Sequence, residues 1–271
     1  MKSQFVELPA AVAGNSPVRI EYRWIHPELR PEPHERPLLV FLHEGLGSAA
    51  MWKSWPQDLC DAGGFRGLVY SRPGYGRSTP RPHHERWPLD YLQRQARELL
   101  PALLGQLGVD PAQTLWLIGH SDGASIALLH AAAYPQRVAG AVVMAPHVFV
   151  EPIARQGITA AREAYLEGGL RNKLARYHDD ADSAFWGWAD VWLDPAFLSW
   201  NIEADLAQIR CPLLAIQGLE DEYGTLEQVR RIGRAVPATR LMELGECGHS
   251  PHRDLALQVN LAIIDFIGQP G

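Results

Sequence analysis

Short apolar runs that end in turn residues recur along the chain and alternate with segments of helical periodicity. Apolar runs rich in Val, Leu and Ile, four of them near-continuous, predict five buried strands, at Leu38–His43, Gly67–Ser71, Thr114–Gly119, Val138–Ala145 and Pro212–Gly218. Arg240–Leu244 predicts a sixth strand of this kind. Phe5–Leu8 and Val18–His26 alternate more between apolar and polar positions, as a half-exposed antiparallel pair does.

Apolar residues at helical spacing predict the elements between these strands. We expect helices over Leu89–Leu107, Ser125–Tyr134, Leu226–Ala235 and Asp254–Ile267. Pro101 should kink or restart the first of them, because proline removes a helical hydrogen bond. Strands that alternate with helices favour an α/β fold, with a mostly parallel central sheet flanked by helices.

The alternation breaks once, between His147 and about Ala207. We find only short helical segments there, such as Ile158–Gly168 and Leu170–Tyr177. A structureless loop of that length is improbable in a compact domain, so we expect a small helical insertion over the edge of the sheet. The predicted core is then residues 1–146 and 208–271, with the insertion at 147–207. A short exposed turn is expected at 31–37 (PEPHERP).

Composition excludes several classes of protein. The 271 residues are 46% hydrophobic and 21% charged, which is typical of a globular chain and not of a disordered or fibrous one. A formal charge of −6 does not supply the excess positive charge that binds a nucleic-acid backbone. No apolar run approaches the ~18 residues that span a membrane. We expect neither partner, and the oligomeric state stays open. The three cysteines have no zinc or disulfide spacing, which favours a cytoplasmic location and no metal.

One pentapeptide carries the strongest chemical signal. Gly119–Gly123 (GHSDG) fits G-x-S-x-G and lies between a predicted strand and an Ala-rich helix. Its glycines permit a sharp, strained turn that lifts the hydroxyl of Ser121 out of the sheet. The motif in this context predicts that Ser121 is a nucleophile.

A nucleophilic serine needs a base and an orienting acid, which follow such a turn in the order Asp or Glu, then His. The predicted strand at 212–217 leads to Asp221, with Glu220 and Glu222 as flanking alternatives. The last predicted strand leads to His249 on a glycine-flanked turn, with His252 as its nearest rival. We assign Asp221 as the acid and His249 as the base.

The negative charge that develops during attack on a carbonyl needs preplaced N–H donors. One should be the amide of Asp122, which follows the nucleophile. The other should come from the loop at 43–48 (HEGLGS), where small residues let the backbone approach a substrate, and Gly45 is the candidate. No cofactor is needed for this chemistry.

These motifs together resemble the α/β-hydrolase superfamily, in its serine-nucleophile branch with a helical cap. GHSDG resembles the nucleophile elbow, HEGLGS the oxyanion loop and YSRPGYGRS the turn after the next strand. GLED and GHSPH resemble the acid and histidine segments. The resemblance implies the α/β-hydrolase fold, the roles given above to Ser121, Asp221, His249, Gly45 and Asp122, and a cap domain at 147–207.

Two residues depart from the family's usual pattern. Ser71 stands where the turn motif often has Asp, and Glu44 stands where the oxyanion loop usually has Gly. The carboxyl group of Glu44 either points away from the substrate or is held beside it, protonated or hydrogen-bonded. We favour a structural role and count Glu44 among the candidate pocket residues.

The insertion is rich in tryptophan, with four of the nine at Trp186, Trp188, Trp192 and Trp200. Trp188 and Trp192 are four residues apart and should share a helix face. Such rings either attach the insertion to the core or form the wall of an apolar pocket, and both can hold for different rings. His147 is a further candidate for the pocket.

Arginines of the insertion offer a second kind of substrate contact. Arg155, Arg171 and Arg176 either bind a substrate carboxylate or form a solvated helix face. The second arrangement is the commoner one for such residues. An arginine that faced Ser121 would favour a substrate with a carboxylate.

The sequence favours a serine hydrolase for a small to medium carboxylic ester, thioester or lactone, acting through an acyl-serine. The first alternative is carbon–carbon bond hydrolysis of a ring-cleavage diketo acid, as some related family members perform. A cofactor-free haloperoxidase activity and a ligand-binding protein on the same fold rank lower. Serine argues against the branches with an Asp nucleophile, the haloalkane dehalogenases and epoxide hydrolases.

Overall fold

The computed structural model describes residues 3–9, 16–28 and 37–269, so the predicted turn at 31–37 lies almost wholly outside them. One eight-stranded sheet has the order β1-β2-β4-β3-β5-β6-β7-β8. Its strands are β1 (Gln4–Leu8), β2 (Val18–Ile25), β3 (Leu38–Leu42), β4 (Arg66–Tyr70), β5 (Leu115–His120), β6 (Val138–Met144), β7 (Leu213–Gly218) and β8 (Thr239–Leu244). β1 and β2 are antiparallel and the other strands are parallel, which confirms the predicted fold class.

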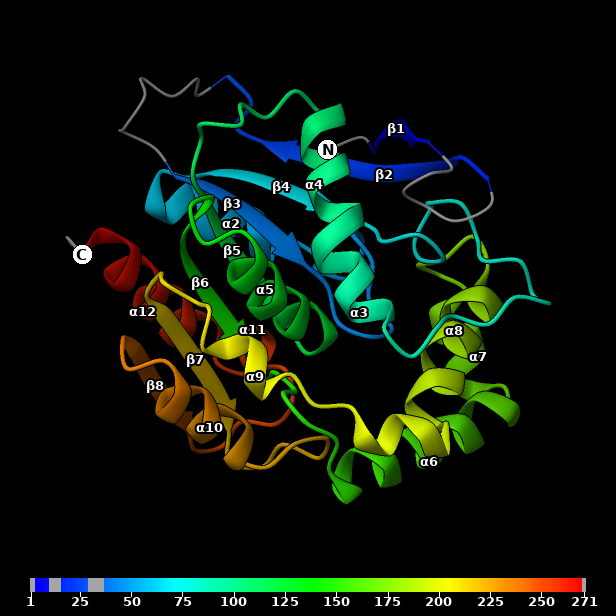
Figure 1. The fold of residues 1–271 in the computed structure, drawn as a ribbon. Coiled ribbons are helices and arrows are strands. Elements are labelled where there is room, and N and C mark those ends of the chain that lie inside the picture. The colour runs from blue at the N-terminus through cyan, green and yellow to red at the C-terminus, as the bar shows by residue number, and fades with distance from the viewer. Residues whose placement is uncertain (1–2, 10–15, 29–36, 270–271) are drawn as a thin grey trace.

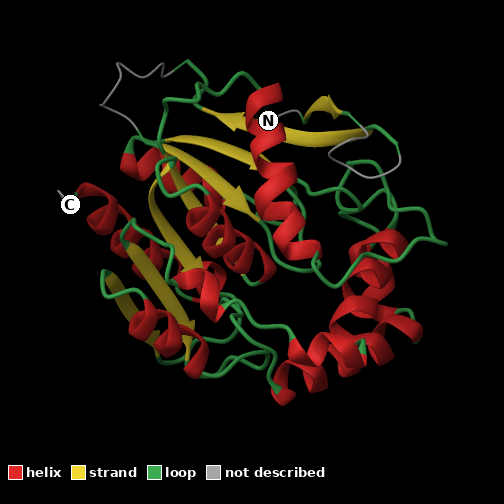
Figure 2. Ribbon diagram, in the orientation of Figure 1, coloured by secondary structure: helices red, strands yellow, loops and turns green. Residues whose placement is uncertain are grey.

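Helices cover both faces of this sheet (Figures 1 and 2). The core-flanking helices are α2 (Trp55–Gly63), α3 (Tyr91–Arg94), α4 (Leu100–Gln106), α5 (Asp122–Ala133), α10 (Glu227–Ala235), α11 (Pro251–Asp254) and α12 (Ala256–Gly268). Alternate residues of β3 enter different cores, with Leu38 and Val40 on the side of α4 and α5, and Leu39 and Phe41 on the side of α2 and α12. A strand buried on both faces explains the continuous apolar run.

The prediction of a doubly covered strand is wrong for β8. This strand is the last in the sheet order, and its Arg240 and Leu241 are exposed. An edge strand pairs on one side only and stays partly open to water. The apolar pattern of the run was too short to distinguish the two environments.

The predicted helix at 89–107 forms as a continuous run of α3, a π-helical turn (Gln95–Leu99) and α4, and the π turn, which comes directly before Pro101, agrees with the expected kink or restart. The predicted helix at 254–267 forms as α12, which begins at Ala256, whereas Asp254 ends the short helix α11. α2 was not predicted, although Pro56 in its first turn and Gly64 at its end, with φ 67°, are start and stop signals.

Between β6 and β7 the chain forms the helical segment, residues 147–207. It contains α6 (Pro152–Leu166), α7 (Gly169–Leu174), α8 (Ala181–Leu193), a 3₁₀ turn (Pro195–Ser199) and α9 (Glu203–Leu206). An antiparallel bridge between Phe149 and Asn201 joins its two ends, and the amide of Ile202 donates to the carbonyl of Val148 over 2.8 Å. α6, α7 and α8 lie beyond the carboxyl ends of the parallel strands (Figure 1). None of the described helices is long and apolar enough to cross a membrane.

Candidate active site

Ser121 occupies a strained turn between β5 and α5. Its φ of 54° and ψ of −119° are unusual for a residue with a side chain. A β-carbon at Gly119 would lie 2.4 Å from the carbonyl oxygen of Gly123, and one at Gly123 would lie 1.9 Å from that of Leu42. Only glycine therefore allows the turn to close against the end of β3, and the closed turn presents Ser121 to a pocket.

His249 and Asp221 meet at the ends of β8 and β7. The ring Nδ1 of His249 lies 2.8 and 2.9 Å from the two carboxylate oxygens of Asp221. Asp221 also accepts hydrogen bonds from the amides of Tyr223 and Gly224 and from the side chain of Gln217. Burial alone would raise the pKa of Asp221, but the hydrogen bond and charge of His249 and the amide of Tyr223 hold it below its usual value. The carboxyl group is therefore ionised at neutral pH.

The alternatives for these two positions lie elsewhere. Glu222 lines the pocket, and the amide of Glu220 donates to the carbonyl of Cys247. His252 packs with its ring centroid 4.9 Å from that of Trp52 and 5.1 Å from that of Trp55. Asp221 is thus the carboxylate that contacts His249.

The loop after β3 turns one amide toward the pocket. The carbonyl oxygen of Glu44 accepts from the amide of Gly47 (3.0 Å), from His43 Nδ1 (2.8 Å) and from Arg72 Nη2 (2.7 Å). Since a trans peptide holds its C=O and N–H on opposite sides, the amide of Gly45 points away from these donors. Gly45 lines the same pocket as Ser121.

The second candidate donor is the amide of Asp122 at the start of α5. The first amides of a helix have no partner within it and carry its positive dipole end. Neither this amide nor that of Gly45 donates a hydrogen bond within the described part of the chain. Both are therefore available to a negatively charged oxygen beside Ser121.

A buried ion pair that the sequence analysis missed connects the two donors. Arg72 is 1% exposed, and its Nη1 lies 3.6 Å from the Oδ2 atom of Asp122. The carboxylate of Asp122 also accepts from the hydroxyl of Tyr91 (2.6 Å) and from Nε1 of Trp192 (3.2 Å). Burial raises the pKa of Asp122, and Arg72 counteracts that effect. Because Arg72 also donates to the carbonyl of Glu44, it ties the loop to the elbow.

The side chain of Glu44 belongs to a second connection. Its Oε2 lies 3.7 Å from His120 Nδ1 and its Oε1 lies 3.5 Å from Arg253 Nη2. Burial opposes ionisation, but His120 and Arg253 hold the pKa of Glu44 well below its usual range, which contradicts the protonated alternative. Nε2 of His120 in turn donates to the carbonyl of His249 over 2.7 Å. Glu44 and His120 therefore support the loop that carries His249.

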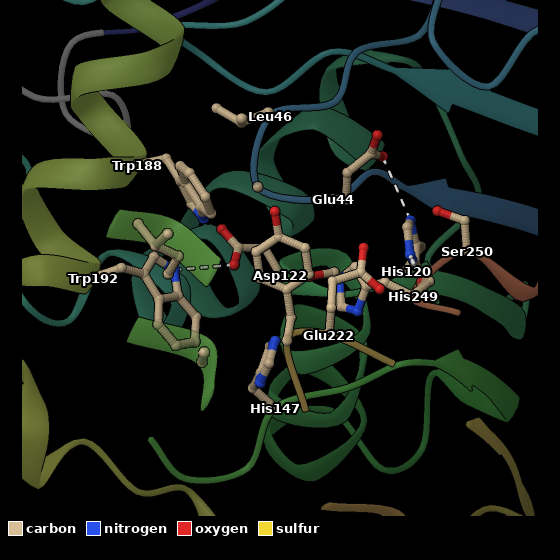
Figure 3. A pocket seen from close by; sticks show the side chains of 15 residues that line it. Glu44, Leu46, His120, Asp122, His147, Trp188, Trp192, Glu222, His249 and Ser250 are labelled. Carbon is tan, nitrogen blue, oxygen red and sulfur yellow. Dashed lines mark hydrogen bonds and ion pairs between the residues drawn. The ribbon is translucent and has the colours of Figure 1, made fainter. Parts of the chain in front are cut away.

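The pocket above Ser121 has a volume of about 180 Å³. The four predicted pocket residues, Glu44, His147, Trp188 and Trp192, all line it. Figure 3 shows Trp188 and Trp192 on one side and Glu44 with Ser250 on the other. The other lining residues are Gly45, Leu46, His120, Ser121, Asp122, Ala154, Ile158, Glu222, Tyr223 and His249.

The crowded tryptophans divide between two tasks. Trp188 and Trp192 line the pocket, whereas Trp186 packs on Tyr165 and Trp200 stacks on Phe197. Trp192 also packs, because its ring meets both Phe197 and Trp200 edge-on or tilted. Both interpretations of the tryptophan-rich stretch therefore hold, for different rings.

The three candidate arginines do not line the pocket. Arg155 donates to the carbonyls of Trp192 and Leu193 at the end of α8. Arg171 pairs with Asp182 at 2.7 Å on the surface, and Arg176 lines a separate polar hollow. The carboxylate-binding alternative gains no support from them. Among the described residues, no group of three or more His, Cys, Asp and Glu could hold a metal ion.

The sequence matches a known protein family over most of its length. A model of the alpha/beta hydrolase family matches residues 39–260. The chain belongs to the alpha/beta hydrolase family. Among family relatives it is 24% identical over 266 residues to a 2-hydroxy-6-oxo-6-phenylhexa-2,4-dienoate hydrolase of Comamonas testosteroni, covering 88% of this chain and 90% of the relative.

Solved alpha/beta hydrolase structures share the architecture over nearly the whole chain. A thermophilic esterase from Thermogutta terrifontis superposes with a TM-score of 0.74 at 19% identity, over 97% of this chain and 98% of the esterase. An enol-lactonase from Burkholderia xenovorans gives a TM-score of 0.68 at 18% identity, over 93% and 97% of the two chains. At these identities the likeness shows the fold. The family model and the sequence relatives support hydrolase activity on a small molecule.

Proposed function

We propose that this alpha/beta hydrolase is a serine hydrolase for a small carboxylic ester, thioester or lactone. The observation that carries the proposal is the shared pocket, where Ser121, on its strained elbow, faces the same space as His249, which is paired with Asp221. Two amides without partners, from Gly45 and Asp122, border that space. Nucleophile, base, orienting acid and oxyanion donors are then all supplied by the chain.

The chemistry follows from these positions. His249 Nε2 takes the proton of Ser121 Oγ as that oxygen attacks the carbonyl carbon, and the amides of Gly45 and Asp122 bind the oxygen that becomes negative. His249 passes the proton to the leaving oxygen or sulfur, which departs and leaves an acyl-serine. Water, deprotonated by His249, then releases the acid. Asp221 holds the imidazole in one tautomer and stabilises its charged form.

We further propose that residues 147–207 are a cap domain over a core of 1–146 and 208–271. α6 and α8 contribute Ala154, Ile158, Trp188 and Trp192 to the pocket wall. The cavity of about 180 Å³ is smaller than the ~300–1,000 Å³ of pockets for drug-sized ligands. The cap therefore favours a small substrate.

The test compares two serines of one pocket. Purified protein should hydrolyse short p-nitrophenyl esters, and Ser121→Ala should lower kcat by at least about 10⁴-fold. Ser250→Ala is the matched control, because Ser250 lines the pocket and has no role in the proposed chemistry. A serine-directed fluorophosphonate should label the wild type and Ser250→Ala only. Unchanged turnover or labelling in Ser121→Ala would refute the proposal.

Carbon–carbon bond hydrolysis is the second candidate, because the Comamonas relative is named for a dienoate substrate, which carries a carboxylate. Within the described residues, however, no Lys or Arg lines the pocket, whereas three carboxyl groups do, those of Glu44, Asp122 and Glu222. Such a pocket offers the carboxylate of a substrate no cation to pair with. Turnover of a vinylogous diketo acid faster than that of simple esters would reverse this ranking.

We propose a cytoplasmic location on the basis of cysteine usage. Cys60, Cys211 and Cys247 are free and buried. Burial raises the pKa of the Cys60 thiol to about 12 and that of the Cys211 thiol to about 11, so both stay protonated. Detection of the native protein in the soluble cytoplasmic fraction would test the location.

A further inference from the structure

His147 enters the pocket with unused hydrogen-bonding capacity. It follows β6, and its backbone is held by the hydroxyl of Ser125, which donates to its carbonyl (2.6 Å) and accepts from its amide (3.2 Å). The side chain is 4% exposed, and its ring makes no hydrogen bond to any described residue. Figure 3 shows the ring in the pocket near Trp192 and Glu222. A fixed backbone thus presents an unpaired ring to the substrate space.

The environment keeps this ring uncharged. Burial, and then the neighbouring His249, lower the pKa of His147 to about 3. A neutral imidazole has one N–H donor and one acceptor nitrogen. The ring centroid lies 5.0 Å from that of Trp192 and 6.0 Å from that of His249, so the ring lies beside the proposed base.

A second unpaired donor lines the same pocket. Trp188 is 7% exposed and lines the pocket, and no described residue accepts a hydrogen bond from its Nε1, which is not itself among the buried atoms without a partner. A β-carbon built on Gly45 would lie 2.2 Å from this nitrogen, so the indole N–H lies over the proposed oxyanion loop. A buried polar atom without a partner is costly, and Nδ1 of His147 is such an atom, which indicates a ligand with polar atoms in this pocket.

Charge narrows the class of ligand. Among the described residues no Lys or Arg lines the pocket, and a neutral imidazole adds no positive charge, so the pocket offers an anion no cation as a partner. A hydroxyl group donates and accepts, so it satisfies either tautomer of His147. A carbonyl oxygen satisfies the N–H of His147 or of Trp188.

We propose that His147 is a specificity-determining residue that binds an uncharged hydroxyl or carbonyl group which the substrate carries in addition to its scissile bond. The inference rests on the proposed ester hydrolysis and names its substrate class. The group belongs to the acyl part or to the alcohol part of the ester. Both sources offer His147 the same chemistry.

The experiment measures preference ratios by pH-stat titration. The substrates are ethyl butanoate, ethyl 3-hydroxybutanoate, ethyl 3-oxobutanoate, 2-hydroxyethyl butanoate and monoethyl succinate. We expect kcat/KM to be about 3- to 10-fold higher for at least one hydroxyl- or carbonyl-bearing ester than for ethyl butanoate, the range of one neutral hydrogen bond. Monoethyl succinate, an anion, should be the poorest substrate. The better of the two hydroxyl esters identifies the part of the substrate that His147 contacts.

Two variants isolate the ring nitrogens. His147→Phe keeps an aromatic ring against Trp192 and should bring the preference ratio to about one, whereas His147→Gln should retain part of it. His252→Phe is the matched control, because both ring nitrogens of His252 are also buried without partners but the residue does not line the pocket. It should leave the ratio unchanged. Melting temperatures and fluorophosphonate labelling establish that each variant is folded.

The outcomes separate this inference from the proposed function. A ratio that survives in His147→Phe, or a wild type that cleaves ethyl butanoate as fast as every polar ester, refutes the role of His147 alone. The proposed serine hydrolase activity itself is refuted if the wild type cleaves none of these esters. It is also refuted if the protein cleaves esters and Ser121→Ala does not lower that activity.

Discussion

The two walls of the pocket are built on different principles. The core wall consists of turns at the ends of β3, β5, β7 and β8, where polar groups are held by paired contacts such as Asp221 with His249 and Arg72 with Asp122. The opposite wall comes from α6 and α8 and consists of large apolar side chains, chiefly Trp188 and Trp192. The contacts of the core wall require exact positions of polar atoms. The contribution of the helical wall comes from the shape and the buried area of its side chains.

This difference separates what each wall contributes. Polar pairs in a buried site lose most of their effect when one partner changes, because the other is left unsatisfied. An aromatic wall changes more gradually, since neighbouring rings share its contacts. We therefore expect variants of the core wall to affect turnover on every substrate, and variants of the helical wall to affect stability or preference.

The largest effect should come from the acid of the core wall. Asp221→Asn keeps the shape of the side chain but donates toward Nδ1 of His249, and so favours the wrong tautomer of the base. We expect kcat to fall about 10⁴-fold on all esters. Steady-state kinetics measure the loss, and Glu222→Gln is the neighbouring control, expected to change kcat less than tenfold. Equal losses in the two variants would contradict the assignment of Asp221.

The next effect concerns the buried pair that links the two oxyanion donors. Arg72→Met leaves Asp122 buried without its cation and removes one of the three donors to the carbonyl of Glu44. We expect the free energy of unfolding to fall by about 3–5 kcal/mol. If the amide of Gly45 is misplaced, kcat should fall about 100-fold.

A double variant distinguishes stability from positioning in this pair. Arg72→Met with Asp122→Asn removes both charges and should recover much of the stability, as measured by urea unfolding. The carbonyl of Glu44 still lacks the donor from Arg72, so kcat should stay below that of the wild type. Recovery of kcat together with stability would show that Arg72 acts only on folding.

The helical wall should divide into a packing residue and a pocket residue. Trp192→Ala removes a ring that packs on Phe197 and Trp200 and that hydrogen-bonds Asp122. We expect a loss of about 3–5 kcal/mol, with all substrates affected alike. Trp188→Ala should instead shift preference toward larger acyl groups, measured with p-nitrophenyl esters of increasing length. If both variants shift substrate preference in the same way, the assignment of Trp192 to packing and of Trp188 to substrate preference is contradicted.

The smallest effect should come from acid titration of buried histidines. Burial lowers the pKa of His147 to about 3 and that of His130 to about 4, below the ordinary value near 6.5. The unfolded chain then binds more protons between these values, so stability is lost as pH falls below about 6.5. The loss should be on the order of 1 kcal/mol per histidine at pH 5.5.

Variants of the two histidines should differ in activity while they agree in stability. His130→Gln and His147→Phe should each flatten the dependence of the unfolding free energy on pH. Only His147→Phe should change substrate preference, because His130 contacts the carbonyl of Ala96 away from the pocket. A pH dependence identical to that of the wild type in both variants would contradict the low pKa values.

The sequence predicted the parts of the site that depend on local backbone geometry. The elbow at Ser121 needs glycines at fixed positions after a strand, and the turn that carries His249 follows the last predicted strand, so both patterns are visible along the chain. The eight strands were predicted within two residues of their observed ends for the same reason. Features that depend only on neighbouring residues can be predicted from the sequence without knowledge of the rest of the fold.

Contacts between distant segments could not be predicted. Arg72 and Asp122 are a buried pair, and nothing local marks either as buried, because exposed arginine and aspartate are far commoner. The connection of Glu44 through His120 to the carbonyl of His249 joins two loops through the end of β5, and the residue types alone do not indicate it. The burial of β8 was predicted wrongly because it depends on the position of the strand in the sheet, and the sequence does not show that β8 is the edge strand.

The bridge between Phe149 and Asn201 has a consequence for how the molecule can diversify. β6 and β7 are adjacent in the sheet, so the chain leaves the core and returns to it at neighbouring points, and this bridge closes the gap. Exchange of the chain between these two points would leave every strand pairing of the sheet in place. A foreign helical segment grafted between residues 149 and 201 should therefore change selectivity, provided that it restores contacts with the core such as that of Trp192 with Asp122.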